Sequence, residues 1–258
     1  MLVAALTGWT GVPALHIGAL LVTALVAGCA RGLSGFGAGL IFIPLASMLI
    51  GPQMSVALLL ITDLIGGLPT LRPAWREAER RSVLIMLGGA LVGMPLGFAA
   101  LLVLDPVLVR WCISVIVLAL LALLVSGWRW RGDAGPPVLA AAGGCGGILS
   151  GLAQIGGPPV VAFWLGMPRP VAVLRANIML YFGLSSVASL MLYGFGGLIT
   201  PAVLAVSVVV TPAYMLGVIL GIRLFRVASP QVFRRLSMVL IGLAAIIGMP
   251  LEWPPLPW

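Results

Sequence analysis

The sequence predicts an all-α integral membrane protein made of two inverted-topology repeats. Of its 258 residues, 62% are hydrophobic and only 8% are charged, whereas a soluble domain carries about 25% charged residues. The mean hydropathy is +1.23. The apolar runs have the length of helices and do not alternate, so we expect membrane-spanning helices rather than a barrel. A glycine-rich motif occurs once in each half of the chain, which suggests two repeats.

The first half is expected to contain one broken, hairpin-like element and three transmembrane helices. The broken element covers residues 12–50 and is interrupted by the glycines of 32–39. The three helices are expected at residues 52–71, 83–104 and 107–125. The charged segment 72–81 is expected to be a loop, and Asp105–Pro106 a short turn.

The second half is expected to repeat this plan. Residues 129–135 combine Trp, Arg, Gly and Asp, which favours a cytoplasmic linker at the membrane interface. This linker separates a first transmembrane repeat, residues 1–128, from a second, inverted one, residues 136–258. The second repeat is expected to contain a broken block at 138–165, helices at 168–193 and 201–220, and a last helix starting at 237. Arginines in 223–235 indicate a basic loop before that last helix.

Two recurring motifs indicate the duplication. Cys29 and Cys145 each begin the pattern Cys-x-x-x-Leu-Ser-Gly. The pattern Gly-x3-Gly-x8-Pro-x3-Arg begins at Gly93 and again at Gly217. We expect the glycine pairs of this second pattern to allow close helix packing, as small residues do in membranes.

The arginines predict the orientation of the two halves. Cytoplasmic loops are enriched in Lys and Arg, so segments 72–81, 129–131 and 223–235 are expected in the cytoplasm. This requires each broken block to make no net crossing or to cross twice. Each half then adds three ordinary crossings, so the second half is inserted upside down relative to the first, a plan that is typical of secondary transporters.

The two broken elements are the candidate binding site. Pro158 and Pro159 cannot continue a helix but suit the first turn of a new one. A helix that starts inside the membrane directs free N–H groups and the positive end of its dipole at the break, which favours an anion. Close helix packing is the alternative explanation for these glycines. The candidate ligand-binding residues at the two breaks are Arg31, Ser34, Gly35, Gly37, Ser150, Gln154, Gly156 and Gly157.

Four polar residues lie in apolar segments and have more than one possible role: Arg31, Asp63, Arg175 and Asn177. Arg31 could bind an anion or reach lipid headgroups, and Arg175 could line the site or snorkel to the interface. Asp63 is a candidate proton carrier, a counter-ion for an arginine, or a lone neutral acid in a packed interface. Asn177 begins a polar helical face that recurs every four residues with Tyr181, Ser185 and Ser189. This face could line a cavity or bond to a neighbouring helix.

The doubled motifs resemble the TauE/SafE family of sulfite and organosulfonate exporters over nearly the whole chain. The resemblance rests on the two Leu-Ser-Gly breaks and on the Gly-x3-Gly-x8-Pro-x3-Arg segments. The family pattern usually has a Gly-x-Gly-Gly-Gly run, whereas this chain has Pro158 where a third glycine is common. The resemblance implies a bacterial inner-membrane, multi-pass secondary transporter that exports a small sulfur-containing anion such as sulfite or sulfoacetate.

Other functions stay open as alternatives. A sulfonate uptake permease or another anion transporter would need the same features, and a membrane scaffold or assembly factor would need neither Arg31 nor Asp63. We do not expect an enzyme, a cofactor or a metal, because no paired carboxylates, His/Cys ligand cluster or nucleophile–base pair occur in any segment. The expected partners are the anion and the lipid bilayer, with no nucleic acid. A second copy of the chain, in a homodimer, is a further candidate partner.

Overall fold

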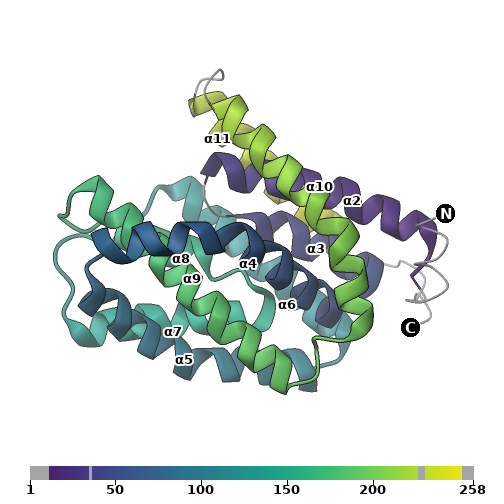
Figure 1. The fold of residues 1–258 in the computed structure, drawn as a ribbon, viewed down its shortest axis with the longest axis horizontal. Coiled ribbons are helices and arrows are strands. Elements are labelled where there is room, and N and C mark those ends of the chain that lie inside the picture. Colours follow the sequence, from purple (N-terminus) through teal and green to yellow (C-terminus); the bar gives the residue numbers. More distant parts are fainter. Residues whose placement is uncertain (1–11, 35–36, 226–229, 252–258) are drawn as a thin grey trace.

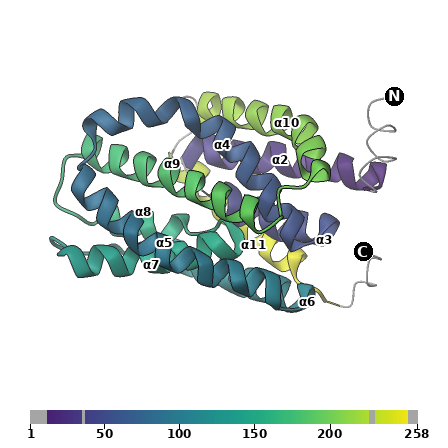
Figure 2. The same ribbon diagram turned by 60° about the horizontal axis from the view of Figure 1, so that its bottom comes forward.

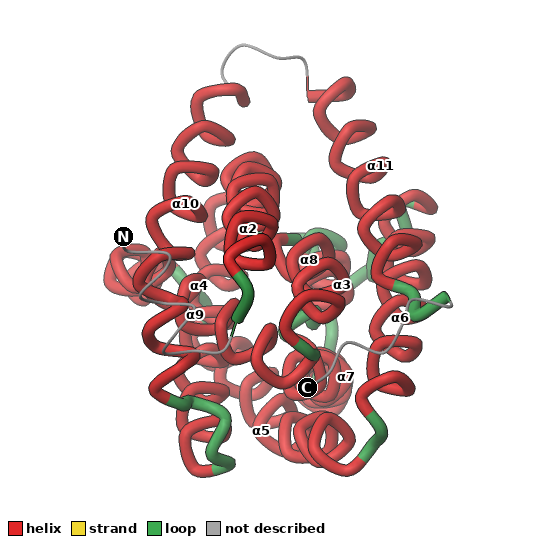
Figure 3. Tube along the Cα trace, turned by 90° about the vertical axis from the view of Figure 1, so that its right-hand side faces the viewer, coloured by secondary structure: helices red, strands yellow, loops and turns green. Residues whose placement is uncertain are grey.

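The computed structural model describes residues 12–34, 37–225 and 230–251, and all regular structure in them is helical (Figure 3). The helices are α2 (Ala14–Ser34), α3 (Ala38–Ile50), α4 (Pro52–Glu77), α5 (Arg80–Val103), α6 (Pro106–Ser126), α7 (Pro136–Ala153), α8 (Gly157–Trp164), α9 (Val171–Phe195), α10 (Pro201–Phe225) and α11 (Pro230–Gly248). Six helices in the described part are long and apolar enough to cross a membrane, or seven if the two segments of the bent α4 form one span. The predicted all-α membrane fold is confirmed.

Both predicted breaks are present. The first separates α2 from α3, and the second separates α7 from α8. Each break uses a left-handed backbone position, with φ of 96° at Gly37 and 55° at Gln154. Pro158 lies in the first turn of α8, where its missing N–H costs no helical hydrogen bond.

Two predicted loops are shorter than expected, because charged residues continue the helices. The segment 72–81 was expected to be a loop, but α4 runs to Glu77 and α5 begins at Arg80. Helix α4 bends by 67° between Pro52–Gly67 and Leu71–Glu77, and Pro73 suits the first turn of the second segment. Likewise, α11 begins at Pro230 rather than 237. Arg and Glu are good helix formers, so charge alone does not end a helix that reaches the membrane surface.

The two halves of the chain interleave rather than standing apart. Helix α5 of the first half packs along α7 of the second, and α2 packs along α10. Helices α4 and α9 lie side by side between these two pairs (Figures 1 and 2). The shorter helices follow the same rule, since α3 contacts α11 while α8 contacts α6. This pairing is unchanged when α2–α6 are exchanged with α7–α11, and it is therefore compatible with a duplication.

Glycines set the closest contacts between the halves. A Cβ atom on Gly93 of α5 would lie 2.2 Å from the carbonyl oxygen of Gly144 of α7. A Cβ on Gly217 of α10 would lie 2.2 Å from the carbonyl oxygen of Leu25 of α2. Because the backbones touch at these points, only glycine fits. The prediction that these glycines allow close packing is confirmed.

Candidate functional site

An ion pair inside the bundle joins Arg31 to Asp63. Arg31 lies in the last turn of α2, and Asp63 lies in the first segment of α4. The guanidinium Nη1 is 2.8 Å from the carboxylate Oδ2, and the two side chains are 24% and 22% exposed. A charged group in a membrane helix requires such a partner. Of the three alternatives for Asp63, the geometry supports a counter-ion and excludes a lone acid.

Tyr214 of α10 completes this charged cluster. Its hydroxyl donates to Asp63 Oδ1 at 2.5 Å, so each oxygen of the carboxylate has a different partner. The Tyr214 side chain is fully buried. Residues from α2, α4 and α10 therefore meet at one carboxylate, and we call Arg31, Asp63 and Tyr214 the charged cluster.

The two breaks meet beside the charged cluster at a small cavity of about 50 Å³. A Cβ on Gly39, in the first turn of α3, would lie 2.6 Å from the carbonyl oxygen of Gln154 in the other break. The two glycine-rich motifs, far apart in sequence, are thus in contact. The small cavity is lined by Arg31, Gly37, Leu40, Asp63, Ser150, Gln154, Ile155, Gly156, Gly157, Pro158, Phe182, Ser185 and Ser186.

The start of α8 offers backbone donors to this cavity. Pro158 and Pro159 have no N–H, so the donors at this helix start are the amides of Gly156 and Gly157. Both glycines line the small cavity. The positive end of the helix dipole reinforces these donors within the first turn.

Gln154 is held in place by a neighbouring helix. Its Nε2 donates to the Ser150 carbonyl at 3.1 Å and to the Tyr193 hydroxyl at 3.2 Å. The Tyr193 hydroxyl in turn donates to the carbonyls of Ser150 and Gly151, at 3.0 and 2.9 Å. Both Nε2–H groups thus have acceptors within the protein, and Gln154 would have to release one of them to donate to an anion as the sequence predicts.

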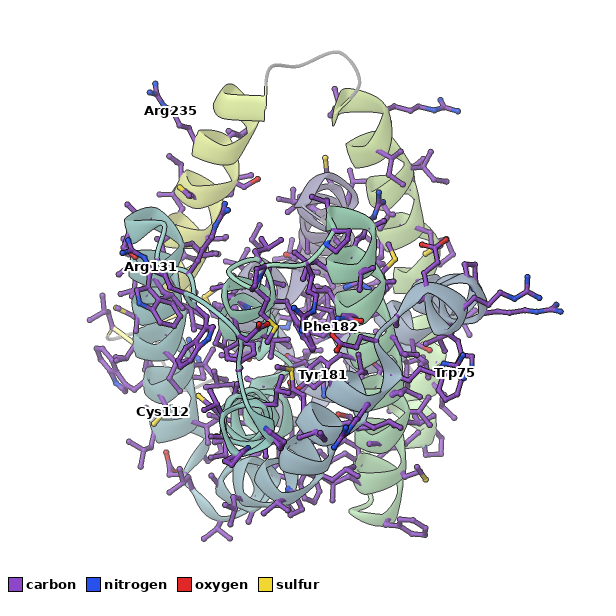
Figure 4. The ribbon with its side chains drawn as sticks, turned by 90° about the vertical axis from the view of Figure 1, so that its left-hand side faces the viewer. Trp75, Cys112, Arg131, Tyr181, Phe182 and Arg235 are labelled. Carbon is purple, nitrogen blue, oxygen red and sulfur yellow. The ribbon has the colours of Figure 1, made fainter. Side chains whose placement is uncertain are left out.

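A large cavity of about 260 Å³ shares Arg31, Asp63, Phe182 and Ser186 with the small one. It is also lined by Leu71 of α4, Arg175 of α9 and Ile222 of α10. Arg175 and Ile222 are exposed. Leu71 and Ile222 lie near the ends of α4 and α10 that lead into the arginine-containing segments 72–81 and 223–235, and Arg175 lies near the start of α9, which binds the turn between α4 and α5. We call this side of the bundle the arginine-rich face. The large cavity therefore leads from the charged cluster to the arginine-rich face. Figure 4 shows Phe182 in the interior of the bundle, whereas Arg131, Trp75 and Arg235 lie at its periphery.

Three predicted site residues lie elsewhere or outside the described part. Asn177 lines neither cavity; its Oδ1 accepts the backbone N–H of Glu79 at 2.7 Å and so fixes the turn between α4 and α5. Gly35 lies outside the described residues, as does the side chain of Ser34.

Sequence reasoning missed Tyr214, Phe182 and Ser186. Tyr214 gave one usable signal, because a tyrosine hydroxyl in an apolar membrane helix needs a hydrogen-bond partner. Phe182 and Ser186 gave none, since phenylalanine and serine are common in membrane helices. The rest of the expected polar face of α9 is mostly packed rather than lining a cavity. Ser189, for example, contacts Met94 of α5, and only Ser185 of that face lines the small cavity.

Comparison with known protein families matches residues 20–247 to the family described as "Sulfite exporter TauE/SafE". The chain belongs to the TauE/SafE family. A relative from Cupriavidus necator, described as "Probable sulfite/organosulfonate exporter TauE", is 28% identical over 106 residues. The alignment covers 41% of this chain and 41% of that relative's length. No solved structure matches the chain.

Family membership and the apolar helices agree on the class of protein. The chain is a multi-pass membrane protein of a transporter family. A location in a bacterial inner membrane is consistent with the bacterial source of the relative.

Proposed function

We propose that this protein exports a small sulfur-containing anion, sulfite or a short organosulfonate such as sulfoacetate, by alternating access. The observation that carries the proposal is the position of Arg31. Its guanidinium lies inside the bundle, where two broken helices meet, and it lines both cavities. A planar guanidinium can donate two parallel hydrogen bonds to the oxygens of a sulfite or sulfonate group.

The surroundings of Arg31 support an anion of this size. The donors nearby are the Gly156 and Gly157 amides and the hydroxyls of Ser150 and Ser186. Arg175 adds a second positive charge in the large cavity, and Asp63 carries the only negative charge among the described residues that line either cavity. The net formal charge of the lining is therefore positive, which attracts anions.

The interleaved pairs α2·α10 and α5·α7 provide elements that can move against each other. In transporters with inverted repeats, access alternates as one group of helices rocks around a fixed site. We place that fixed site at Arg31 and the two breaks, and the large cavity is then the path to the arginine-rich face.

The test is efflux of sulfite, sulfoacetate, isethionate and sulfate from preloaded proteoliposomes. We expect saturable efflux of at least one sulfur-containing anion, faster than in protein-free liposomes. Absence of saturable flux for every anion would overturn the proposed function. Flux that only fills the vesicles, against the direction proposed, would indicate an uptake permease.

Matched arginine variants test the site. Arg31→Gln with Asp63→Asn removes both charges and leaves no unpaired ion; we expect the apparent affinity to fall at least 30-fold, the equivalent of about 2 kcal/mol. Arg110→Gln is the control, because Arg110 also lies in an apolar helix but binds the Gly248 carbonyl and lines neither cavity. It should keep the wild-type affinity. Equal losses in the two proteins would contradict the site assignment.

A further inference from the structure

The carboxylate of Asp63 already binds the guanidinium of Arg31, which an incoming anion would need. Its Oδ2 is 2.8 Å from Arg31 Nη1, within the cavity where the two breaks meet. A sulfonate bound to the same guanidinium would place a second negative charge next to the first. Like charges at this separation strongly disfavour each other, so the ionised Asp63 and the anion compete for Arg31.

We propose that Asp63 is an internal competitor of the transported anion, and that each anion that binds at Arg31 is accompanied by one proton taken up by Asp63. The inference rests on the proposed function and names the coupling of that same site. The proton comes from solvent and neutralises the carboxylate. When the anion leaves, Asp63 releases the proton and pairs with Arg31 again.

Few other groups can supply or take this proton. Arg31 from α2 and Tyr214 from α10 touch the carboxylate, and Arg175 from α9 lines the same large cavity. Helix α3, which also packs against α4, carries no titratable side chain. The charged Arg80 and Arg81 of α5 lie in its first turn and line neither cavity.

Tyr214 is a positioning residue in this scheme. Its hydroxyl donates to Asp63 Oδ1, whereas Arg31 binds Oδ2, so the two partners hold different oxygens of the carboxylate. The bond also keeps Asp63 next to the guanidinium after it is neutralised, so that the pair can form again when the anion departs.

The scheme sets the energetics of transport. When the anion is a monoanion such as isethionate, it moves together with one proton, so its flux carries no net charge and does not respond to membrane potential. Export then proceeds wherever the outward anion gradient exceeds the opposing proton gradient. By linkage, the factor by which protonation of Asp63 tightens anion binding equals the factor by which the anion tightens proton binding, and such factors are typically about 5–150.

Calorimetric titration with isethionate tests the linkage in the purified full chain. Isethionate is suitable because a sulfonate stays ionised near neutral pH. Titrations in two buffers of different ionisation enthalpy give the protons taken up per anion. We expect close to one proton in the wild-type protein and none in Asp63→Asn, which should bind roughly 10-fold more tightly at high pH and show no pH dependence.

The outcomes separate the two proposals. Saturable binding by the wild-type protein without proton uptake would overturn the coupling and leave the anion site standing, and this result needs no variant to fold. Wild-type proton uptake in Asp63→Asn would also overturn the coupling. Absence of binding together with absence of flux for every anion would overturn both.

Discussion

Two adjacent glycines of α5 make a strict test of how the halves interleave. Gly88 and Gly89 are neighbours in the same helix, but a Cβ on Gly89 would lie 1.9 Å from the carbonyl oxygen of Ala140 in α7, whereas a Cβ on Gly88 meets nothing within 4 Å. Replacing each with alanine adds the same methyl group to the same helix. Only the Gly89→Ala methyl points at the other half of the chain.

The size of the effect follows from the contact distance. Ordinary van der Waals contact begins at 3.4 Å, so α5 and α7 would have to separate by about 1.5 Å at Gly89. The obstacle is a backbone carbonyl, which cannot rotate away as a side chain can. Overpacking of this kind costs about 1–3 kcal/mol, and we expect the upper end here. Alanine regains about 1 kcal/mol of helix propensity over glycine, which leaves Gly89→Ala destabilised by about 2 kcal/mol.

Gly88→Ala should gain that propensity without the clash. For a chain of this length, 1 kcal/mol corresponds to about 2–4 °C in melting temperature. Thermal unfolding in one detergent should therefore place Gly89→Ala roughly 4–8 °C below the wild type and Gly88→Ala slightly above it. The order of the two variants is the critical result: if Gly89→Ala melts with or above the wild type, α5 and α7 do not pack as described.

Three further predictions use other parts of the fold. Arg169→Ala removes ion pairs to Asp133 and Glu79; since these are half exposed, stability should fall by less than about 1 kcal/mol, but trypsin should cut segment 127–135 several-fold faster. Tyr193→Phe removes one of the two acceptors of the Gln154 amide and the hydroxyl that donates to the Ser150 and Gly151 carbonyls, while the bond from the Gln154 amide to the Ser150 carbonyl stays. Stability should therefore fall by about 1–3 kcal/mol, and an unchanged melting temperature would contradict the network. Reporter fusions after Ala78 and after Leu198 should report opposite sides of the membrane, because α9 connects the two levels.

Both breaks could be predicted from the sequence because a break in a helix depends on the residues at that position. Pro158 and Pro159 cannot lie inside a helix, and the repeated Leu-Ser-Gly pattern marks the first break by analogy with the second. Those residues of the small cavity that lie near a break, such as Arg31 and Ser150, were predicted for the same reason. The contact between the two breaks follows from the topology, since two helices that both begin at a break inside the bundle have their first turns at a similar depth.

The charged cluster could be predicted only in part. Asp63 was a candidate counter-ion for an arginine because a lone acid in an apolar helix is costly. Its second partner, Tyr214, is 151 residues away in sequence, and no periodicity or spacing links the two positions. Tertiary packing alone decides such a contact. The ends of α4 and α11 were missed for a different reason, because arginines that mark a membrane surface can still be helical.

Glycines at the contact between α2 and α10 also determine the geometry of the charged cluster. A Cβ on Gly28 of α2 would lie 2.2 Å from the carbonyl oxygen of Tyr214, and a Cβ on Gly32 would lie 2.2 Å from that of Val218, both in α10. Gly28 lies about one turn before Arg31, and Gly32 directly follows it. They fix the separation of α2 and α10 at the level where Arg31 and Tyr214 both reach Asp63. A larger residue at Gly28 would therefore move the tyrosine hydroxyl away from the carboxylate without touching a bound anion. Gly28 and Gly32 thus act on the site through helix separation, whereas Gly156 and Gly157, at the start of α8, line the small cavity directly.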